Sequence, residues 1–364
     1  MAVNVLKNVR IKGISCAVPS HIKYSKEYET VIGAEATEKF INTVGIKSRH
    51  LGDGKITTSD LCYTAANDVI EKTGVERKEI DALIFLSQTP DYLAPATACV
   101  LQHRLGLSND CLAFDINLCC SGYVYGLHTA MLHMQTGYLK KVLLLVGDTA
   151  SYTCSPEDRG QMMLFGDAGS ATMLEYDTNA KDTTFLLKTK GDGYKNLIIP
   201  FGGYRHWQGS YERTMHQDGM IRSDYDCYMD GAEVFKFSIM EVPKLIKEFS
   251  EKTGYRYEDA DRVVFHQANM FIIKNIAKRL RIDSEKLLFS MDEYGNTGSA
   301  SLPLTMCRFY SQNNEQKKIE NVMICGYGIG LSLGAANIHI DNSVCNQIIY
   351  SDEVYDDHID EILR

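Results

Sequence analysis

Three short motifs place reactive or hydrogen-bonding side chains just after apolar, strand-like segments. They are Cys120-Ser121-Gly122, His266-Gln267-Ala268-Asn269 and Tyr294-Gly295-Asn296-Thr297-Gly298. A thiol can carry an acyl group, and an imidazole and an amide can donate hydrogen bonds to a thioester that faces it. This combination suits the formation of a carbon–carbon bond on a thioester better than it suits hydrolysis.

Cys120 is the candidate nucleophile. It follows the apolar segment Leu112–Ile116 and precedes a helical pattern that runs from Ser121 to about Gly137. The small residues Ser121 and Gly122 permit a tight turn, and the amides and dipole at a helix N-terminus lower the pKa of a thiol placed there. The adjacent Cys119 is the alternative nucleophile, but the direction of the strand and turn favours Cys120.

His266 and Asn296 are the candidate hydrogen-bond donors. His266 ends a strand-like segment, at the position where open α/β sheets bind ligands, and a neutral imidazole can donate from Nε2 to a thioester carbonyl. Asn296 lies in a sequence that is typical of a turn, so its catalytic interpretation depends on a match with Cys120 in an internal repeat. In the segment Gly326-Tyr327-Gly328-Ile329-Gly330, small residues allow backbone amides to form an oxyanion hole together with the amide of Cys120.

Short apolar segments alternate with helical patterns along the chain. Strands are expected at Asp81–Ser87, Leu112–Ile116, Lys141–Gly147, Arg262–His266, Leu287–Ser290 and Val322–Gly326, and helices at Ser59–Thr73 and Phe271–Leu280. This alternation predicts a parallel sheet that is covered on both faces.

A weak internal repeat predicts a duplicated architecture. The segment 79–85 resembles the segment 259–265, and in each case a polar loop, a strand-turn-helix pattern and another apolar strand follow in the same order. The expected halves are residues 1–176, with the nucleophilic cysteine, and residues 177–342, with the histidine and the asparagine. The polar segment 202–231 is predicted to be a long loop or lid. The acidic tail, residues 343–364, can add a short helix, a contact with a partner, or nothing.

The composition is that of a globular protein with a large core. The 364 residues are 45% hydrophobic and 23% charged, and the net charge of −9 disfavours nucleic acid as a partner. The 11 cysteines show no C-x-x-C spacing, so neither a metal site nor a disulfide framework is expected. The sequence shows no signal-peptide pattern and no apolar run of membrane-spanning length. These features predict a cytoplasmic protein.

Further motifs extend the pattern across residues 5–342. They are Val44-Gly45-Ile46-Lys47-Ser48-Arg49-His50, Ala94-Pro95-Ala96-Thr97-Ala98-Cys99, Asp158-Arg159-Gly160 and Leu164-Phe165-Gly166-Asp167-Ala168-Gly169. Together the motifs resemble those of the thiolase-like condensing enzymes, and most closely those of the β-ketoacyl-acyl-carrier-protein synthase III family. The resemblance implies an α/β, five-layered αβαβα fold built from two duplicated halves, and a homodimer.

The resemblance also implies a ping-pong condensation. Cys120 would accept an acyl group from acyl-CoA or acyl-ACP, and the carbanion left by decarboxylation of malonyl-ACP would attack it. His266 and Asn296 would stabilise the enolate, and the amides of Cys120 and Ile329 would form the oxyanion hole. Arg159 and Asn269 match positions that contact coenzyme A or pantetheine. No permanently bound cofactor is implied, since coenzyme A and phosphopantetheine thioesters are substrates in fatty-acid or specialised lipid and polyketide synthesis.

Several positions depart from the family pattern. Lys39 and Thr43 replace the Trp and Arg that hold the adenine end of coenzyme A, and Ala232 replaces an Asn that contacts pantetheine. Ile329 replaces the usual glycine of the oxyanion hole. Ala94 stands where a Phe often caps the acyl pocket across the dimer. These departures lead to two hypotheses: the donor is held differently or is an acyl-carrier protein, and the acyl pocket admits a larger group.

Three other functions fit parts of the pattern. An acyltransferase of the same fold would pass the acyl group to an alcohol or amine. A non-decarboxylative condensation would need an additional base, for which Asp91 is the candidate carboxylate. A non-catalytic partner subunit would shape an acyl pocket, although such partners usually lose the nucleophile and this chain keeps it.

Overall fold

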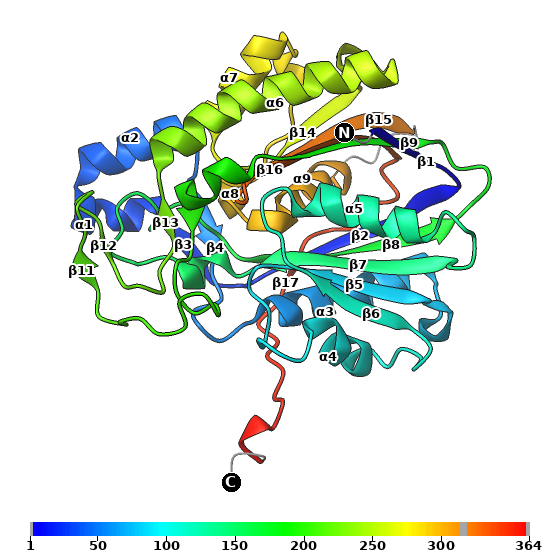
Figure 1. Cartoon of the computed structure of the whole chain (residues 1–364), viewed down its shortest axis with the longest axis horizontal. Helices are drawn as coiled ribbons and strands as arrows, with labels where there is room; N and C mark the ends of the chain where they lie inside the picture. The colour runs from blue at the N-terminus through cyan, green and yellow to red at the C-terminus, as the bar shows by residue number, and fades with distance from the viewer. Residues whose placement is uncertain (1–2, 313–318, 362–364) are drawn as a thin grey trace.

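Two mixed β-sheets form the centre of the protein (Figure 1). The computed structural model describes residues 3–312 and 319–361. The first sheet has six strands, in the order β17 (Ile349–Tyr350), β2 (Val9–Val18), β8 (Ala168–Tyr176), β7 (Lys141–Asp148), β5 (Ala82–Leu86) and β6 (Leu112–Ile116). The second has five, in the order β1 (Val3–Leu6), β9 (Thr183–Thr189), β16 (Ser332–Ile340), β15 (Glu320–Gly328) and β14 (Arg262–Phe265).

The predicted strands do pair in parallel, β5 with β6 and β7, and β14 with β15, but the prediction of a wholly parallel sheet was wrong, because each sheet also contains antiparallel strands. Only β17 with β2, β5 with its neighbours β6 and β7, and β14 with β15 run parallel; the other pairs are antiparallel. The segment between β15 and β16 contains three residues, which is too short for the crossover that a parallel pair needs. The apolar character of these strands comes from burial on both faces rather than from parallel pairing.

Helices lie between the sheets and outside each of them. α5 (Gly122–His133) and α9 (Ser301–Tyr310) pack between the two sheets, α3 (Thr58–Thr73) and α4 (Thr97–Arg104) cover the first, and α6 (Gly231–Thr253) and α7 (Met270–Leu280) cover the second. Figure 1 shows these five layers from α6 and α7 at the top to α3 and α4 at the bottom. The structure confirms the predicted αβαβα architecture.

The long helices begin and end where their capping residues predict. Thr57 and Asp60 form a capping box at the start of α3, and Gly74 ends that helix in the left-handed conformation. Asp230 accepts hydrogen bonds from two amides at the start of α6, and Gly254 ends it. The predicted helix from Ser121 is shorter than expected, since α5 ends at His133.

The expected strand Leu287–Ser290 is absent, and this prediction was wrong as well. Only an isolated bridge between Val263 and Leu287 is present there. The Gln267 side chain takes the place of a neighbouring strand, because its Nε2 lies 3.4 Å from the Leu288 carbonyl oxygen and its Oε1 accepts from the Ser290 amide at 2.9 Å. An amide side chain therefore satisfies backbone groups that a longer β-strand would have paired.

Shorter elements lie at the side of the layers. They are α1 (Glu29–Ile32), α2 (Ala34–Val44), α8 (Met291–Tyr294), β3 (Ile22–Tyr24), β4 (Ser48–His50), β10 (Leu197–Ile198), β11 (Thr214–Met215), β12 (Ile221–Arg222) and β13 (Tyr228–Met229). Within the described residues, no helix has the length and apolar character needed to cross a lipid bilayer.

The tail beyond residue 343 packs along the chain as far as it is described. β17 pairs with β2 at the edge of the first sheet. Farther on, the Tyr355 amide donates to Asp60 at 3.1 Å, and its ring lies 4.2 Å from the Arg104 guanidinium. Arg104 itself forms a buried ion pair with Asp60 at 3.0 Å. The tail therefore contacts α3 and α4.

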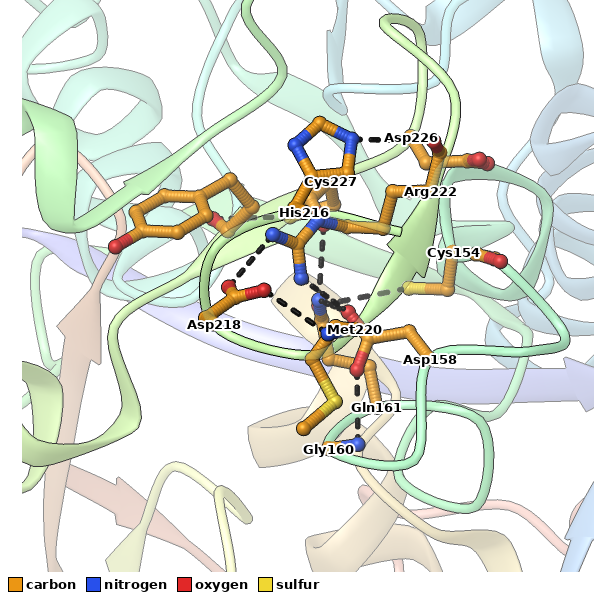
Figure 2. Close-up of polar contacts among 12 residues, drawn as sticks. Cys154, Asp158, Gly160, Gln161, His216, Asp218, Met220, Arg222, Asp226 and Cys227 are labelled. Atoms are coloured by element: carbon orange, nitrogen blue, oxygen red, sulfur yellow. Dashed lines mark hydrogen bonds and ion pairs between the residues drawn. The ribbon is translucent and has the colours of Figure 1, made fainter. Parts of the chain in front are cut away.

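A buried ion pair attaches the polar segment 202–231 to the turn at residues 158–161 (Figure 2). The Arg222 guanidinium lies between two carboxylates, 2.9 Å from Asp158 Oδ2 and 2.6 Å from Asp218 Oδ2. Gln161 Nε2 also donates to Asp158, at 3.1 Å, and to the Cys227 carbonyl, at 2.8 Å. The side chains of Arg222 and Asp158 are 5% and 3% exposed, so this pair joins the segment to the 158–161 turn in a water-poor environment.

Replacing Arg222 with Ala should lower the free energy of unfolding by about 3 to 5 kcal/mol, because it leaves a buried carboxylate uncompensated. Urea unfolding and the rate of tryptic cleavage within residues 202–231 measure the effect. Arg213→Ala is the control in the same segment. The Arg213 side chain lies 3.2 Å from Asp226 and is 40% exposed, so its removal should lower the free energy of unfolding by only about 0 to 1 kcal/mol. Equal losses in the two variants would contradict the anchoring role of Arg222.

Candidate active site

Cys120 lies in the turn between β6 and α5. Gly122 opens the helix, and its amide donates to the Cys119 carbonyl at 2.6 Å, which closes the turn. A side chain on Gly122 would overlap Leu86 of β5. The turn can therefore pack against the first sheet only with glycine at this position, and Cys120 is held buried before the start of the helix.

The end of β15 packs directly against the Cys120 turn. A Cβ atom on Gly326 would lie 2.8 Å from Ser121 Cα, and one on Gly328 would overlap the Cys120 side chain. Gly328 also has a φ of +153°, a conformation that L side chains rarely adopt. Next to this contact, the hydroxyls of Ser121 and Ser332 lie 2.7 Å apart. Backbone of the second sheet thus reaches the candidate nucleophile with no side chain between.

His266 follows β14 and is fully buried. Its Nδ1 lies 2.8 Å from Ser301 Oγ, and its ring meets the Tyr327 ring edge-on. The Ser301 contact fixes the ring orientation and leaves Nε2 for the cavity.

Asn296 is held by backbone on both sides. The backbone N–H of Asn296 donates to the Leu164 carbonyl at 3.0 Å, and the backbone carbonyl of Asn296 accepts from the Gly166 amide at 3.0 Å. The side-chain Oδ1 accepts from the Gly298 amide at 3.1 Å. Because the oxygen is occupied in this way, the NH2 group of the carboxamide is the part left to donate.

A cavity of about 230 Å3 brings the three candidate residues together. Cys120, His266 and Asn296 line it. The rest of its wall is mostly apolar and comes from Leu164, Phe165, Leu197, Met229, Gly231, Val234, Phe235, Ser238, Ala268, Asn269, Ile272, Tyr327 and Gly328. An apolar wall strengthens the hydrogen bonds that these polar groups make inside the cavity.

The surroundings of Cys120 favour its thiolate. A hydrogen bond with Cys119 holds the pKa of Cys120 well below its usual value of 9.0, against the opposing effect of burial. The neighbouring His266 and the backbone amide of Ile329 lower this pKa further. The same Ile329 amide is the one expected in the oxyanion hole.

The other expected site residues lie in three different settings. Asn269 lines the cavity, but its Oδ1 accepts from the Ile272 amide at 2.8 Å as the N-cap of α7. Arg159 is exposed and does not line the cavity. Ala94 is exposed as well and lies outside the cavity wall of this single chain. Asp91 lies outside it too, and burial raises its pKa to about 6.

Two supporting residues had no signal in the sequence. Ser301 orients His266, and a serine in a helical segment is unremarkable by itself. Asp148 ends β7 and is buried; it binds the amide and hydroxyl of Ser299, which follows the Asn296 motif. A side chain on Gly298 would overlap Asp148. No cluster of three or more His, Cys, Asp or Glu side chains suited to a metal ion occurs in the described part of the chain.

Comparison with protein families gives two matches. Residues 114–193 match the model described as 3-oxoacyl-[acyl-carrier-protein] synthase III, and residues 250–340 match the model of its C-terminal region. The β-ketoacyl-[acyl-carrier-protein] synthase III of Clostridium perfringens is 33% identical, over 92% of this chain and 100% of that protein. The enzyme of the same name from Acholeplasma laidlawii is 32% identical, over 92% and 100% of the two chains.

Solved structures show the same likeness. A 3-oxoacyl-(acyl-carrier protein) synthase from Burkholderia xenovorans superimposes with a TM-score of 0.89 at 34% identity, over 96% of this chain and 99% of that one. The Thermus thermophilus synthase III superimposes with a TM-score of 0.78 at 29% identity, over 90% and 98%. These matches confirm the resemblance, the fold class and the acyl-transferring condensing activity predicted from the motifs. The chain belongs to the β-ketoacyl-acyl-carrier-protein synthase III family of thiolase-like condensing enzymes.

Proposed function

We propose that the chain condenses an acyl thioester with malonyl-ACP through an acyl group carried on Cys120. The observation that carries the proposal is the single cavity lined by Cys120, His266 and Asn296. In the first half-reaction, the Cys120 thiolate attacks the thioester of acyl-CoA or acyl-ACP and expels the donor thiol. The lowered pKa of Cys120 supports this role, because the thiolate is the nucleophilic form of cysteine.

In the second half-reaction, malonyl-ACP loses carbon dioxide and leaves an enolate on its thioester. His266 donates from Nε2, with the Ser301 hydroxyl donating to Nδ1, and Asn296 donates from its NH2 group. Both hydrogen bonds point at the thioester oxygen, where charge develops. The enolate carbon then bonds to the acyl carbon, and the amides of Cys120 and Ile329 bind the tetrahedral oxyanion. The carbon–sulfur bond breaks, and its electron pair returns to Cys120.

Arg159, Asn269 and Ala94 belong to the same proposal. Arg159 is free to reach a coenzyme A or pantetheine donor at the surface, and Asn269 lines the cavity through which pantetheine would pass. Ala94, on an exposed turn, would close the acyl pocket of the other subunit in a homodimer. The homodimer, the cytoplasmic location and the division into halves 1–176 and 177–342 with a separate tail 343–364 remain predictions. Family membership does not favour the transfer of the acyl group to an alcohol or amine.

Cys120 should be alkylated by iodoacetamide with a pH midpoint below 9, since its lowered pKa leaves more thiolate at neutral pH. The rate should rise with pH until it passes that midpoint and then level off. Peptide mapping by mass spectrometry at a series of pH values measures the alkylation rate of Cys120, and N-acetylcysteine is the reference thiol. A midpoint at or above that of the reference would contradict the proposed nucleophile.

Asn296→Ala should slow condensation strongly while leaving acylation of Cys120 intact, because only the enolate needs this donor. Removal of one such donor lowers kcat by about 100- to 1000-fold. Intact mass after mixing with acyl donors, with and without malonyl-ACP, separates the two half-reactions. The exposed Asn179→Ala is the control and should behave as the unaltered protein does. An acyl adduct that malonyl-ACP discharges equally well in Asn296→Ala would exclude this role.

Ala94→Phe should narrow the range of acyl donors. The larger ring would occupy space in the pocket of the other subunit, so kcat/KM should fall for long or branched donors and change little for acetyl-CoA. Initial rates with a series of acyl chain lengths test this. If the unaltered protein turns over acetyl-CoA alone, or if Ala94→Phe loses activity equally on every donor, the assignment of Ala94 to the acyl pocket is wrong.

A further inference from the structure

The turn between β5 and α4 carries Ala94 at an uncovered, apolar tip. The Asp91 amide donates to the Thr97 hydroxyl at 3.0 Å, and this hydrogen bond closes the turn behind the tip. Residues 93–95 are exposed, and the Leu93 side chain is 68% exposed. The single chain therefore fixes the base of the turn and leaves its tip free of cover.

Tyr92 stands directly before this tip and is bound by the C-terminal tail. Its hydroxyl donates to the Asp357 carboxylate. This hydrogen bond raises the pKa of Tyr92 to about 12, so the phenol keeps its hydrogen at neutral pH and remains a donor. The two residues are 265 positions apart, and the tail is the element that brings them together.

The tail is itself anchored close to Asp357. It runs from β17 past α3 and is drawn in red in Figure 1. The Tyr355 amide donates to Asp60 at 3.1 Å, and the Tyr355 ring lies 4.2 Å from the Arg104 guanidinium. The Tyr63 ring of α3 lies 4.6 Å from the same guanidinium, whose side chain is only 4% exposed. A buried cation of α4 thus fixes the tail two residues before Asp357.

We propose that the tail selects among acyl donors, because Asp357 and Tyr92 are positioning residues that hold the Ala94 tip in place. The inference rests on the proposed function, in which Ala94 closes the acyl pocket of the other subunit. A long or branched acyl group extends from Cys120 to the end of that pocket and packs against the tip. An acetyl group is too short to do so.

A tip that is held before the donor binds loses less conformational freedom when the acyl chain packs against it. The tail therefore acts on the binding of long donors and leaves the chemistry at Cys120 unchanged. Since Asp357 is exposed, the contribution of its hydrogen bond is that of an ordinary one and not of a buried ion pair.

The test uses two variants that remove the same hydrogen bond from opposite sides. Tyr92→Phe keeps the ring and loses the hydroxyl, and Asp357→Ala loses the acceptor. In each, KM for long or branched acyl-CoA donors should rise by about 2- to 10-fold, the effect of one lost hydrogen bond. KM for acetyl-CoA, and kcat for every donor, should stay near those of the unaltered protein. Initial rates with a series of acyl-CoA lengths measure the split.

Hydrogen–deuterium exchange gives a second readout that does not depend on activity. The peptide that covers residues 88–96 should exchange faster in both variants, because the tip has lost one of its attachments. The double variant should be no worse than either single variant, since one bond is removed in all three. Asp356→Ala is the matched control in the tail: its carboxylate accepts from the His358 amide at 3.0 Å and should leave both readouts unchanged.

Unchanged KM values for long donors in both single variants would overturn the inference. A rise in KM that is equal for every donor, acetyl-CoA included, would also overturn it, because the tail would then only stabilise the fold. Both results leave the acylation of Cys120 intact. If the unaltered protein forms no acyl adduct on Cys120 with any donor, the proposed function fails, and this inference fails with it.

Discussion

The site depends on direct contact between the Cys120 turn and the backbone at the end of β15. Gly326 and Gly328 have no side chains, and each lies where a Cβ atom would collide with Ser121 or Cys120. The first sheet supplies the thiol, and the segment after β15 in the second supplies the Ile329 amide that lowers the pKa of this thiol. Because these two groups belong to different sheets, the complete site forms only when the glycine end of β15 packs against the turn.

The polar groups around this contact follow a common arrangement. One ring nitrogen of His266 forms a hydrogen bond with Ser301, and the side-chain oxygen of Asn296 accepts a hydrogen bond from the Gly298 amide. Asp148 uses both oxygens to join β7 to the segment after Asn296. His266 and Asn296 each have one part committed to a buried partner, which fixes the orientation of the side chain and leaves another part for the reaction, whereas Asp148 only holds the segment in place. Such preorganised donors stabilise developing charge without having to rearrange during the reaction.

The outer parts of the chain are attached by buried guanidinium groups rather than by long β-ladders. Arg222 fastens the 202–231 segment to the turn that precedes Arg159, and Arg104 lies between Asp60 and the ring of Tyr355 in the tail. Neither attachment touches the Cys120 cavity wall.

The sequence predicted much of the fold and singled out the three candidate side chains that line one cavity, since both leave local signals. Apolar runs marked β5, β6, β7, β14 and β15, and helical patterns marked α3, α5 and α7. Cys120, His266 and Asn296 were found because each follows such a segment in a distinctive motif. The sequence also predicted a strand at Leu287–Ser290, where a glutamine side chain replaces the strand partner. Apolar runs did not reveal the mixed strand directions, because burial on both faces looks the same in either direction.

Only the tertiary structure determines the contacts between residues that are far apart in the chain. Asp148 and Ser299 are 151 positions apart, and the sequence around either residue does not indicate that they are in contact. The contact between Ser301 and His266 is likewise not indicated by the sequence around either residue. Local patterns record burial and backbone conformation along one element. The orientation of a hydrogen bond depends on which elements pack together, and that is determined by the folded chain as a whole.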